Sequence, residues 1–195
     1  MAKSKGVKIR ISTPDDVYGI RQVQKKTWLV TYPNESLGIS RDSIAEKFAH
    51  DNEPQGKQKL ERQKLRYLLT DRQVWVAEKV DDETGEKEII GFCTALRERE
   101  TNRLAAIYVD PDYQHQGVGT QMVKELLSWL GDEKDILVNV VSYNQPAINF
   151  YQKFGFKKTG REGILDDGAV LPSGAVIPEL EMRKEASIFK YVTKD

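Results

Sequence analysis

The sequence has few of the residues that build disulfides and metal centres. Among its 195 residues are one cysteine, Cys93, and two histidines, His50 and His115. A lone cysteine cannot form an intrachain disulfide, which favours a reducing compartment. These three residues are too few for a four-ligand zinc site, and the histidines show no pattern of a triad, so we expect no metal. Because Cys93 lies in the apolar segment 91–95, we expect a buried structural thiol there.

Net charge and long apolar segments are also missing. The 30 basic residues balance 30 acidic ones, so no global field attracts nucleic acid or a membrane surface. No segment approaches the roughly 20 apolar residues that cross a bilayer, and there is no signal peptide or lipidation motif. We therefore expect a soluble cytoplasmic protein with no nucleic-acid or membrane partner. Its length and its 39% of hydrophobic residues suit one domain with its own core.

Hydrophobic periodicity predicts helices and strands in the order β-α-α-α-β-β-β-α-β-α-β-β, which makes one mixed sheet covered by helices. Strands are predicted at 7–11, 73–80, 88–97, 103–109, 136–141, 155–160 and 176–184. Helices are predicted from Thr13, from Ser40, and at about 57–69, 117–130 and 145–153. No repeat or linker divides the chain. We expect a single domain over 1–195, with its core at about 7–185 and a loosely held tail at 186–195.

The most informative segment is 109–120, Val-Asp-Pro-Asp-Tyr-Gln-His-Gln-Gly-Val-Gly-Thr, which joins a strand end to a helix start. The first main-chain N–H groups of a helix lack intrahelical partners, and the helix dipole favours negative charge there. Gly117 and Gly119 would let a phosphate approach the backbone closely. The alternative is that both glycines only shape a tight turn. Other phosphate motifs do not fit, because there is no P-loop and Met122 replaces the third glycine of a dinucleotide fingerprint.

A second segment, 144–156, reads Asn-Gln-Pro-Ala-Ile-Asn-Phe-Tyr-Gln-Lys-Phe-Gly-Phe. Asn144 and Tyr151 are seven residues apart, about two helical turns, so they share one face of the predicted helix. Taken alone, this segment has a simpler interpretation. Asn144 would then be a helix cap, and Tyr151 a core aromatic residue with a wet hydroxyl.

Together the two segments resemble the acetyl-CoA-binding blocks of the GNAT superfamily. The first is Gln-x-x-Gly-x-Gly preceded by Tyr-Val-Asp-Pro-x-Tyr, and the second is Asn-x-x-Ala-x-x-Phe-Tyr-x-x-x-Gly-Phe at the family's distance downstream. The resemblance covers roughly 103–156, and residues 12–70 match only in outline. It implies an α/β (mixed α+β) fold, whose central, mostly antiparallel, twisted sheet has about seven strands flanked by helices. It also implies an N-acetyltransferase whose partners are acetyl-CoA and an amine acceptor.

The resemblance assigns roles to individual residues. The loop amides would grip the CoA pyrophosphate, and the edge of the preceding strand would pair with the pantetheine arm. Asn144 would contact the cofactor. Tyr151 would contact it and act as general acid, because a phenol stays protonated at neutral pH and can donate to the leaving sulfur. The predicted cofactor-binding set is Ile107, Tyr108, Val109, Gln114, His115, Gln116, Gly117, Val118, Gly119, Thr120, Asn144 and Tyr151.

One position departs from the family pattern. Many members carry a glutamate near the start of the strand before the loop, and this chain has Arg103 there. Glu98 and Glu100 would serve if a bulge re-aims them, and Glu100 is the catalytic candidate beside Tyr151. The alternative is a solvated, charged strand end. A base is not strictly required, because positioning a neutral amine against the thioester removes much of the entropic barrier. We favour direct attack by the amine in a ternary complex.

The resemblance places the acceptor beside the connection that follows the first helix. Trp28 and Tyr32 are the substrate candidates, with a core position as the alternative for Trp28. Convergence of loop carboxylates would favour a cationic acceptor such as a polyamine, whereas scattered, solvated charges would not. The loop carboxylates are Glu35, Asp51, Glu53, Asp166 and Asp167. The loop 163–175 is a candidate lid or homodimer contact.

Three functions remain open. The first is acetyl transfer to a primary amine, either of a small molecule, a polyamine, an aminoglycoside-like compound, or a peptide or protein. The second is a non-catalytic acetyl-CoA-binding regulatory module, which Arg103 favours and Tyr151 disfavours. The third, a nucleotide-binding interaction domain, is disfavoured because the P-loop and dinucleotide signatures are missing.

Overall fold

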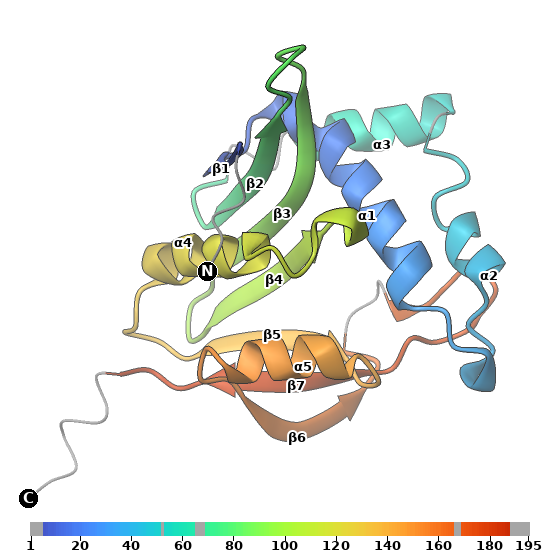
Figure 1. The fold of residues 1–195 in the computed structure, drawn as a ribbon. Coiled ribbons are helices and arrows are strands. Elements are labelled where there is room, and N and C mark those ends of the chain that lie inside the picture. Colours follow the sequence, from blue (N-terminus) through green and yellow to red (C-terminus); the bar gives the residue numbers. More distant parts are fainter. Residues whose placement is uncertain (1–5, 52, 65–68, 166–168, 188–195) are drawn as a thin grey trace, which may run out of the picture.

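A computed structural model describes residues 6–51, 53–64, 69–165 and 169–187. They form a seven-stranded sheet with helices on both faces (Figure 1). The strands are β1 (Val7–Ile11), β2 (Arg72–Val80), β3 (Lys87–Arg97), β4 (Asn102–Val109), β5 (Ile136–Val141), β6 (Lys157–Gly163) and β7 (Glu179–Lys184). The helices are α1 (Val17–Thr31), α2 (Arg41–Glu46), α3 (Pro54–Lys64), α4 (Val118–Leu130) and α5 (Gln145–Gln152). The predicted fold class and element order are confirmed.

The sheet divides between β4 and β5. The strands follow the order β1-β2-β3-β4-β5-β7-β6, and every neighbouring pair is antiparallel except β4–β5. These two parallel strands pair only through Asn102↔Ile136 and Arg103↔Leu137, and they then diverge (Figure 1). Where β4 pairs with β3, Thr94 faces Ala106 and Ala95 faces Leu104, which leaves one extra residue as a bulge in β4. A bulge bends its strand, so β4 turns away from β5 and opens the sheet.

Separate hydrophobic clusters cover the two faces of the sheet. On one face α4 and α5 pack against the strands, with Met122 and Ile148 in the same cluster as Val138 and Met182. On the other face Val23 of α1 packs with strand residues such as Phe92. Alternating strand residues point to opposite faces, so one strand can serve both clusters.

A third cluster joins the C-terminal end of α1 to α2 and to the chain that precedes β7. It contains Trp28, Phe48, Leu171 and Ile177, all at most 8% exposed. The loop 163–175 is therefore tied into the protein at Ala169 and Leu171, while 166–168 lie outside the described residues. A lid or dimer role for this loop stays a prediction.

Several element ends differ from the predicted ones. A 3-10 turn, Pro14–Asp16, precedes α1. α3 begins at Pro54, and the predicted helix end at 65–68 lies outside the described residues. β7 begins at Glu179 rather than at 176, because Pro178 has no N–H to donate to a ladder and Val176 instead bridges to Val170. Of the predicted tail, only 186 and 187 are described.

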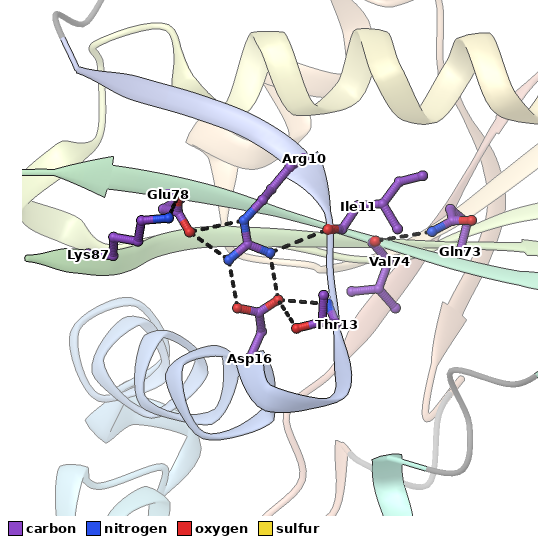
Figure 2. Close-up of polar contacts among 8 residues, drawn as sticks. All are labelled: Arg10, Ile11, Thr13, Asp16, Gln73, Val74, Glu78 and Lys87. Carbon is purple, nitrogen blue, oxygen red and sulfur yellow. Dashed lines mark hydrogen bonds and ion pairs between the residues drawn. The ribbon is translucent and has the colours of Figure 1, made fainter.

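A network of charged side chains fixes β1 to the start of α1 (Figure 2). Arg10 donates from Nη1 and Nη2 to the two carboxylate oxygens of Asp16, at 2.7 and 2.8 Å. It also donates from Nε and Nη2 to Oε2 of Glu78 on β2, at 3.0 and 2.7 Å. Asp16 in turn accepts from the main-chain N–H of Thr13 at 2.7 Å, and Lys87 lies 3.6 Å from Glu78. Both carboxylates are buried, so paired charges hold this corner together.

Candidate functional site

The split in the sheet opens into a cleft of about 2120 Å³. It extends from the loop after β4 to the C-terminal end of α1, and most of the predicted site residues line it. They are Trp28, Tyr32, Ile107, Tyr108, Val109, Gln114, His115, Gln116, Gly117, Gly119, Thr120, Asn144 and Tyr151. Val118 is a partial exception, because its side chain is buried in the core and only its main chain belongs to the loop.

The loop at 114–120 presents main-chain N–H groups to one end of the cleft. Helix α4 begins at Val118, and Gln121 is the first residue whose N–H bonds into the helix, to the carbonyl of Gly117. Within the described part of the chain, no group accepts a hydrogen bond from the N–H groups of residues 115–120. His115 and Gly117 have φ of 62° and 85°, a left-handed geometry that turns successive N–H groups inward. Unpaired N–H groups at a helix start form an anion site.

Three contacts hold this loop in place, and the sequence pattern indicated none of them. Lys26 of α1 bridges the carboxylates of Asp110 and Asp112, at 2.8 and 2.6 Å. The Gln114 amide donates to the carbonyl of Val109 at 3.0 Å. The Thr27 hydroxyl donates to the same carbonyl at 3.3 Å. The loop is therefore preorganised by α1, which lies far from it in the sequence.

The space left by the missing side chain of Gly119 is available to a ligand and is not required by other parts of the protein. A methyl group added at this residue would meet Phe150 and Val109 at 3.6 Å, an ordinary van der Waals distance. The backbone of Gly119 also has no left-handed φ that would demand glycine. The fold alone does not explain a glycine here, whereas close approach of a phosphate to the backbone does.

The part of β4 beyond Arg103 offers a free strand edge to the cleft. On its β5 side, residues 104–109 have no ladder partner among the described residues. Ile107, Tyr108 and Val109 lie on this edge and line the cleft. An exposed edge binds an extended ligand through main-chain hydrogen bonds.

Asn144 and Tyr151 share the face of α5 that borders the cleft. Asn144 caps the helix, because its side-chain oxygen accepts from the N–H of Ala147 at 3.2 Å. Its cap role and its place on the cleft wall are compatible. Tyr151 is 6% exposed and also lines the cleft. Burial, with smaller effects from Tyr108 and Cys93, raises the pKa of Tyr151 well above its ordinary value, so the phenol keeps its proton at neutral pH.

Aromatic side chains form the other end of the cleft. The rings of Trp28 and Tyr32 meet edge to face at 5.1 Å, and both residues are 8% exposed. Trp28 is thus a core residue and a wall residue at once. The Tyr32 and Tyr108 hydroxyls are 3.3 Å apart, and Tyr143 donates to the carbonyl of Tyr32 at 2.7 Å. Burial raises the pKa of Tyr143 to about 12.

The structure does not bring Glu100 to the cleft. Glu100 is exposed in the turn between β3 and β4, and Glu98 pairs with Arg103 at 3.2 Å. The bulge that was expected to re-aim these carboxylates lies in β4 between Leu104 and Ala106, past the turn, so it leaves them facing solvent. The alternative interpretation, a solvated and charged strand end, describes this region better.

The loop carboxylates do not converge in the described residues. Glu35 is exposed, Asp51 pairs with Arg21 at 2.8 Å, and Glu53 pairs with His50 at 2.9 Å. None of these three lines the cleft. Asp166 and Asp167 lie outside the described residues.

Cys93 lies in the core. It is fully buried, and burial raises the pKa of its thiol to about 12, so it stays protonated. Across the described ranges, no group of three or more His, Cys, Asp or Glu side chains is placed to hold a metal. Each described helix is too short or too polar to cross a bilayer.

Some cleft residues were not anticipated from the sequence. Lys124 of α4, Lys153 at the end of α5 and Glu179 at the start of β7 all line it. Lys124 carries a signal that could have been used, because it lies two helical turns after Gly117 and so shares a face with the loop. Glu179 carries none, because its position depends on how β7 pairs in the sheet.

Comparisons with known proteins agree with this geometry. A family model described as "Acetyltransferase (GNAT) domain" matches residues 70–158. The peptidyl-lysine N-acetyltransferase YjaB of Salmonella typhimurium is 33% identical over 105 residues, which are 54% of this chain and 64% of that relative. The chain thus matches less than two thirds of the relative's length.

Solved structures share the fold over most of the chain. The PaiA N-acetyltransferase of Thermoplasma acidophilum, in complex with coenzyme A, superposes with a TM-score of 0.65 at 21% identity, covering 92% of this chain and 98% of that one. The apo form of YjaB from Escherichia coli has a TM-score of 0.52 at 24% identity, with 91% and 96% covered. At such identities the likeness concerns the fold.

Proposed function

Because this chain is a member of the GNAT superfamily, we propose that it is an acetyl-CoA-dependent N-acetyltransferase. The acceptor is a primary amine of a small molecule, a peptide or a protein, and it attacks directly in a ternary complex. The observation that carries the proposal is the row of unpaired N–H groups at 115–120, at the mouth of the split between β4 and β5. These N–H groups suit the pyrophosphate of one ligand, and the free β4 edge beside them suits the extended pantetheine arm of the same ligand.

The charges around the cleft also support a polyanionic cofactor. Basic residues line it on α4 and α5, including Lys124 and Lys153. Side chains of one sign along a cleft raise the local concentration of an oppositely charged ligand. We further propose that the protein works in the cytoplasm, because its single cysteine, buried in the core, suits a reducing compartment. A homodimer stays a prediction.

Each part of the site has one task in this reaction. Acetyl-CoA supplies an activated thioester. The N–H groups of the loop hold its diphosphate, and the β4 edge aligns the thioester arm beside Tyr151. Tyr151, protonated because it is buried, donates its proton to the sulfur that leaves. Asn144 would contact the arm from the first turn of α5.

Two measurements test the proposal. Acetyl-CoA should raise the melting temperature, and CoA should be released over a panel of primary amines, as detected by a thiol reagent. Tyr151→Phe should lower kcat by roughly 100-fold, since a general acid contributes this much, and should leave the acetyl-CoA thermal shift intact. Absence of a thermal shift would refute the proposal. A shift without turnover would indicate the non-catalytic binding module instead.

A further inference from the structure

The described wall of the cleft contains one acidic side chain, Glu179. Basic residues line the same cleft at five described positions, namely Lys47, Arg72, Arg103, Lys124 and Lys153. A carboxylate in such surroundings opposes the binding of a polyanionic cofactor. Among the described lining residues it is therefore the one carboxylate that a positively charged second ligand could meet.

The sheet register places Glu179 at the acceptor end. It is the first residue of β7 and faces Val141 of β5 in the ladder. Opposite residues in an antiparallel pair project to the same face. Val141 packs with Trp28 and Tyr32, so Glu179 lies on their face of the sheet, away from α4 and α5. It is half-buried there.

Electrostatic effects connect this carboxylate with the tyrosines. Burial raises the pKa of Tyr32 well above its usual range, and Tyr108, Tyr151 and the negative charge of Glu179 add to this effect. Tyr32 therefore lies within electrostatic range of Glu179 and of the proposed general acid Tyr151. The carboxylate and the acid both line this one cleft, on the side of the split that β5 and β7 form.

We propose that Glu179 binds the ammonium group of the acceptor and removes its proton, an inference that rests on the proposed function. The acceptor then has one positive charge on an apolar stem. One carboxylate balances one ammonium, and the rings of Trp28, Tyr32 and Tyr108 suit the stem. A polyamine would bring further positive charges toward lysines and arginines. A small monoamine and the lysine side chain of a peptide both have the favoured chemistry.

The proton balance assigns one step to each group. The ammonium gives its first proton to Glu179, and the freed lone pair forms the C–N bond while the C–S bond breaks. The nitrogen loses a second proton to water as the amide forms, Glu179 then releases the first proton to water, and the sulfur takes one from Tyr151. Tyr151 is reprotonated from solvent. The net result is one amide, one CoA thiol and one proton released to water.

The test uses Glu179→Gln, which keeps the side-chain shape and removes the charge. Phenethylamine and a lysine peptide serve as monocationic probes, spermidine as a polycation, and phenethyl alcohol as a neutral isostere. We expect kcat/KM for the monoamines to fall by about 100-fold, as expected for loss of a general base. The KM for acetyl-CoA should not rise and its thermal shift should not fall, because the substitution removes a negative charge that opposes the cofactor. Glu179→Asp should restore part of the activity.

Glu181→Gln is the matched control. Glu181 lies two residues further on the same strand and the same face, pairs with Arg161 at 2.9 Å, and does not line the cleft. Its substitution should leave kcat/KM for the amines unchanged. Retention of full monoamine activity in Glu179→Gln would overturn the inference and leave the proposed function standing.

A binding measurement keeps the inference testable without turnover. Trp28 lies in the cleft, so binding of an amine should change tryptophan fluorescence. We expect phenethylamine, but not phenethyl alcohol, to bind the wild type, and binding to weaken in Glu179→Gln. Equal binding to both proteins, or no binding of either monoamine to the wild type, would overturn the role of Glu179. Failure of acetyl-CoA to bind would instead refute the proposed function.

Discussion

Arg10 joins three segments of the chain through two buried carboxylates. Burial alone raises the pKa of Asp16, but hydrogen bonds from Arg10 and Thr13 outweigh it and bring the pKa below its usual value. The hydrogen bond from Arg10 likewise lowers the pKa of Glu78. Removal of the guanidinium would leave these carboxylates without their strongest partner. Breaking a buried ion pair costs far more than the pair itself contributes.

We expect Arg10→Met to lower the free energy of unfolding at pH 7 by about 3 kcal/mol, the lower end for a broken buried pair. A carboxylate with a lowered folded-state pKa stabilises the fold above its unfolded pKa, roughly 4, and loses this effect as pH falls through its folded pKa. The gap between variant and wild type should therefore shrink toward pH 3. Urea denaturation of both proteins at pH 7 and at pH 3 measures this difference in the free energy of unfolding.

Lys87→Met provides the control for this network. Lys87 approaches the same carboxylate of Glu78 but only at 3.6 Å, and its side chain is 66% exposed. Exposed pairs contribute at most about 1 kcal/mol. Equal destabilisation by the two substitutions, or a gap that does not depend on pH, would contradict the role given to Arg10.

At the scale of elements, the first turn of α4 contains a glycine, Gly119, that we expect ligand binding to require and folding not to require. Gly119→Ala adds a methyl group at ordinary contact distances from Phe150 and Val109. Alanine is favoured over glycine in a helix, so we expect the free energy of unfolding to rise by about 0.5–1 kcal/mol. The same methyl group occupies the approach of the diphosphate. The acetyl-CoA thermal shift should therefore diminish strongly in this more stable variant.

Ser128→Ala is the companion variant, because Ser128 is exposed on the same helix and does not line the cleft. It should change stability slightly and leave acetyl-CoA binding as it is. If Gly119→Ala binds acetyl-CoA like the wild type, the close approach of the ligand to this backbone is wrong.

Local pattern was sufficient to predict most elements, because capping and periodicity act within a few residues. Ser40 caps α2 by accepting from the N–H of Ser43, and Gly131 ends α4, as their positions indicated. The loop after β4 was also predictable, since glycines at a helix start carry their own signal. The start of the last strand was less predictable. β7 begins only at Glu179, because Pro178 and a bridge at Val176 intervene.

Side chains brought in from distant segments could not be predicted. Lys26 reaches Asp110 across 84 positions, and no local pattern relates the two. Glu179 enters the cleft only because β7 pairs beside β5, which is a matter of sheet order. Glu100 was suggested by the family pattern around Arg103, and the real position of the bulge leaves it in solvent.

At the scale of the whole molecule, the sheet consists of two parts joined by two residue pairs. A ligand that pairs with the β4 edge would complete the sheet where β5 departs. We expect CoA to slow hydrogen exchange in 104–109 and 115–120, while β2, which is paired on both sides, should not change. At 100 times the Kd, linkage permits slowing by about 100-fold.

Hydrogen-exchange mass spectrometry with and without CoA measures this difference. Protection confined to 115–120 would show that the diphosphate binds but that the arm does not lie along β4. Uniform slowing across all strands would indicate general stabilisation rather than completion of a split sheet. The single-domain organisation stays a prediction, although one sheet joins strands from Val7 to Lys184.

The contact of Lys26 with Asp110 and Asp112 has a consequence for anyone who redesigns this protein. Helix α1 carries Trp28 on the wall of the cleft and, one or two positions earlier, Lys26 and Thr27, which hold the loop. A library that randomises this helix to accept new amines would also remove the contacts that hold the loop proposed to bind acetyl-CoA. Diversity should therefore be confined to the face that holds Trp28, with residues 26 and 27 left as they are.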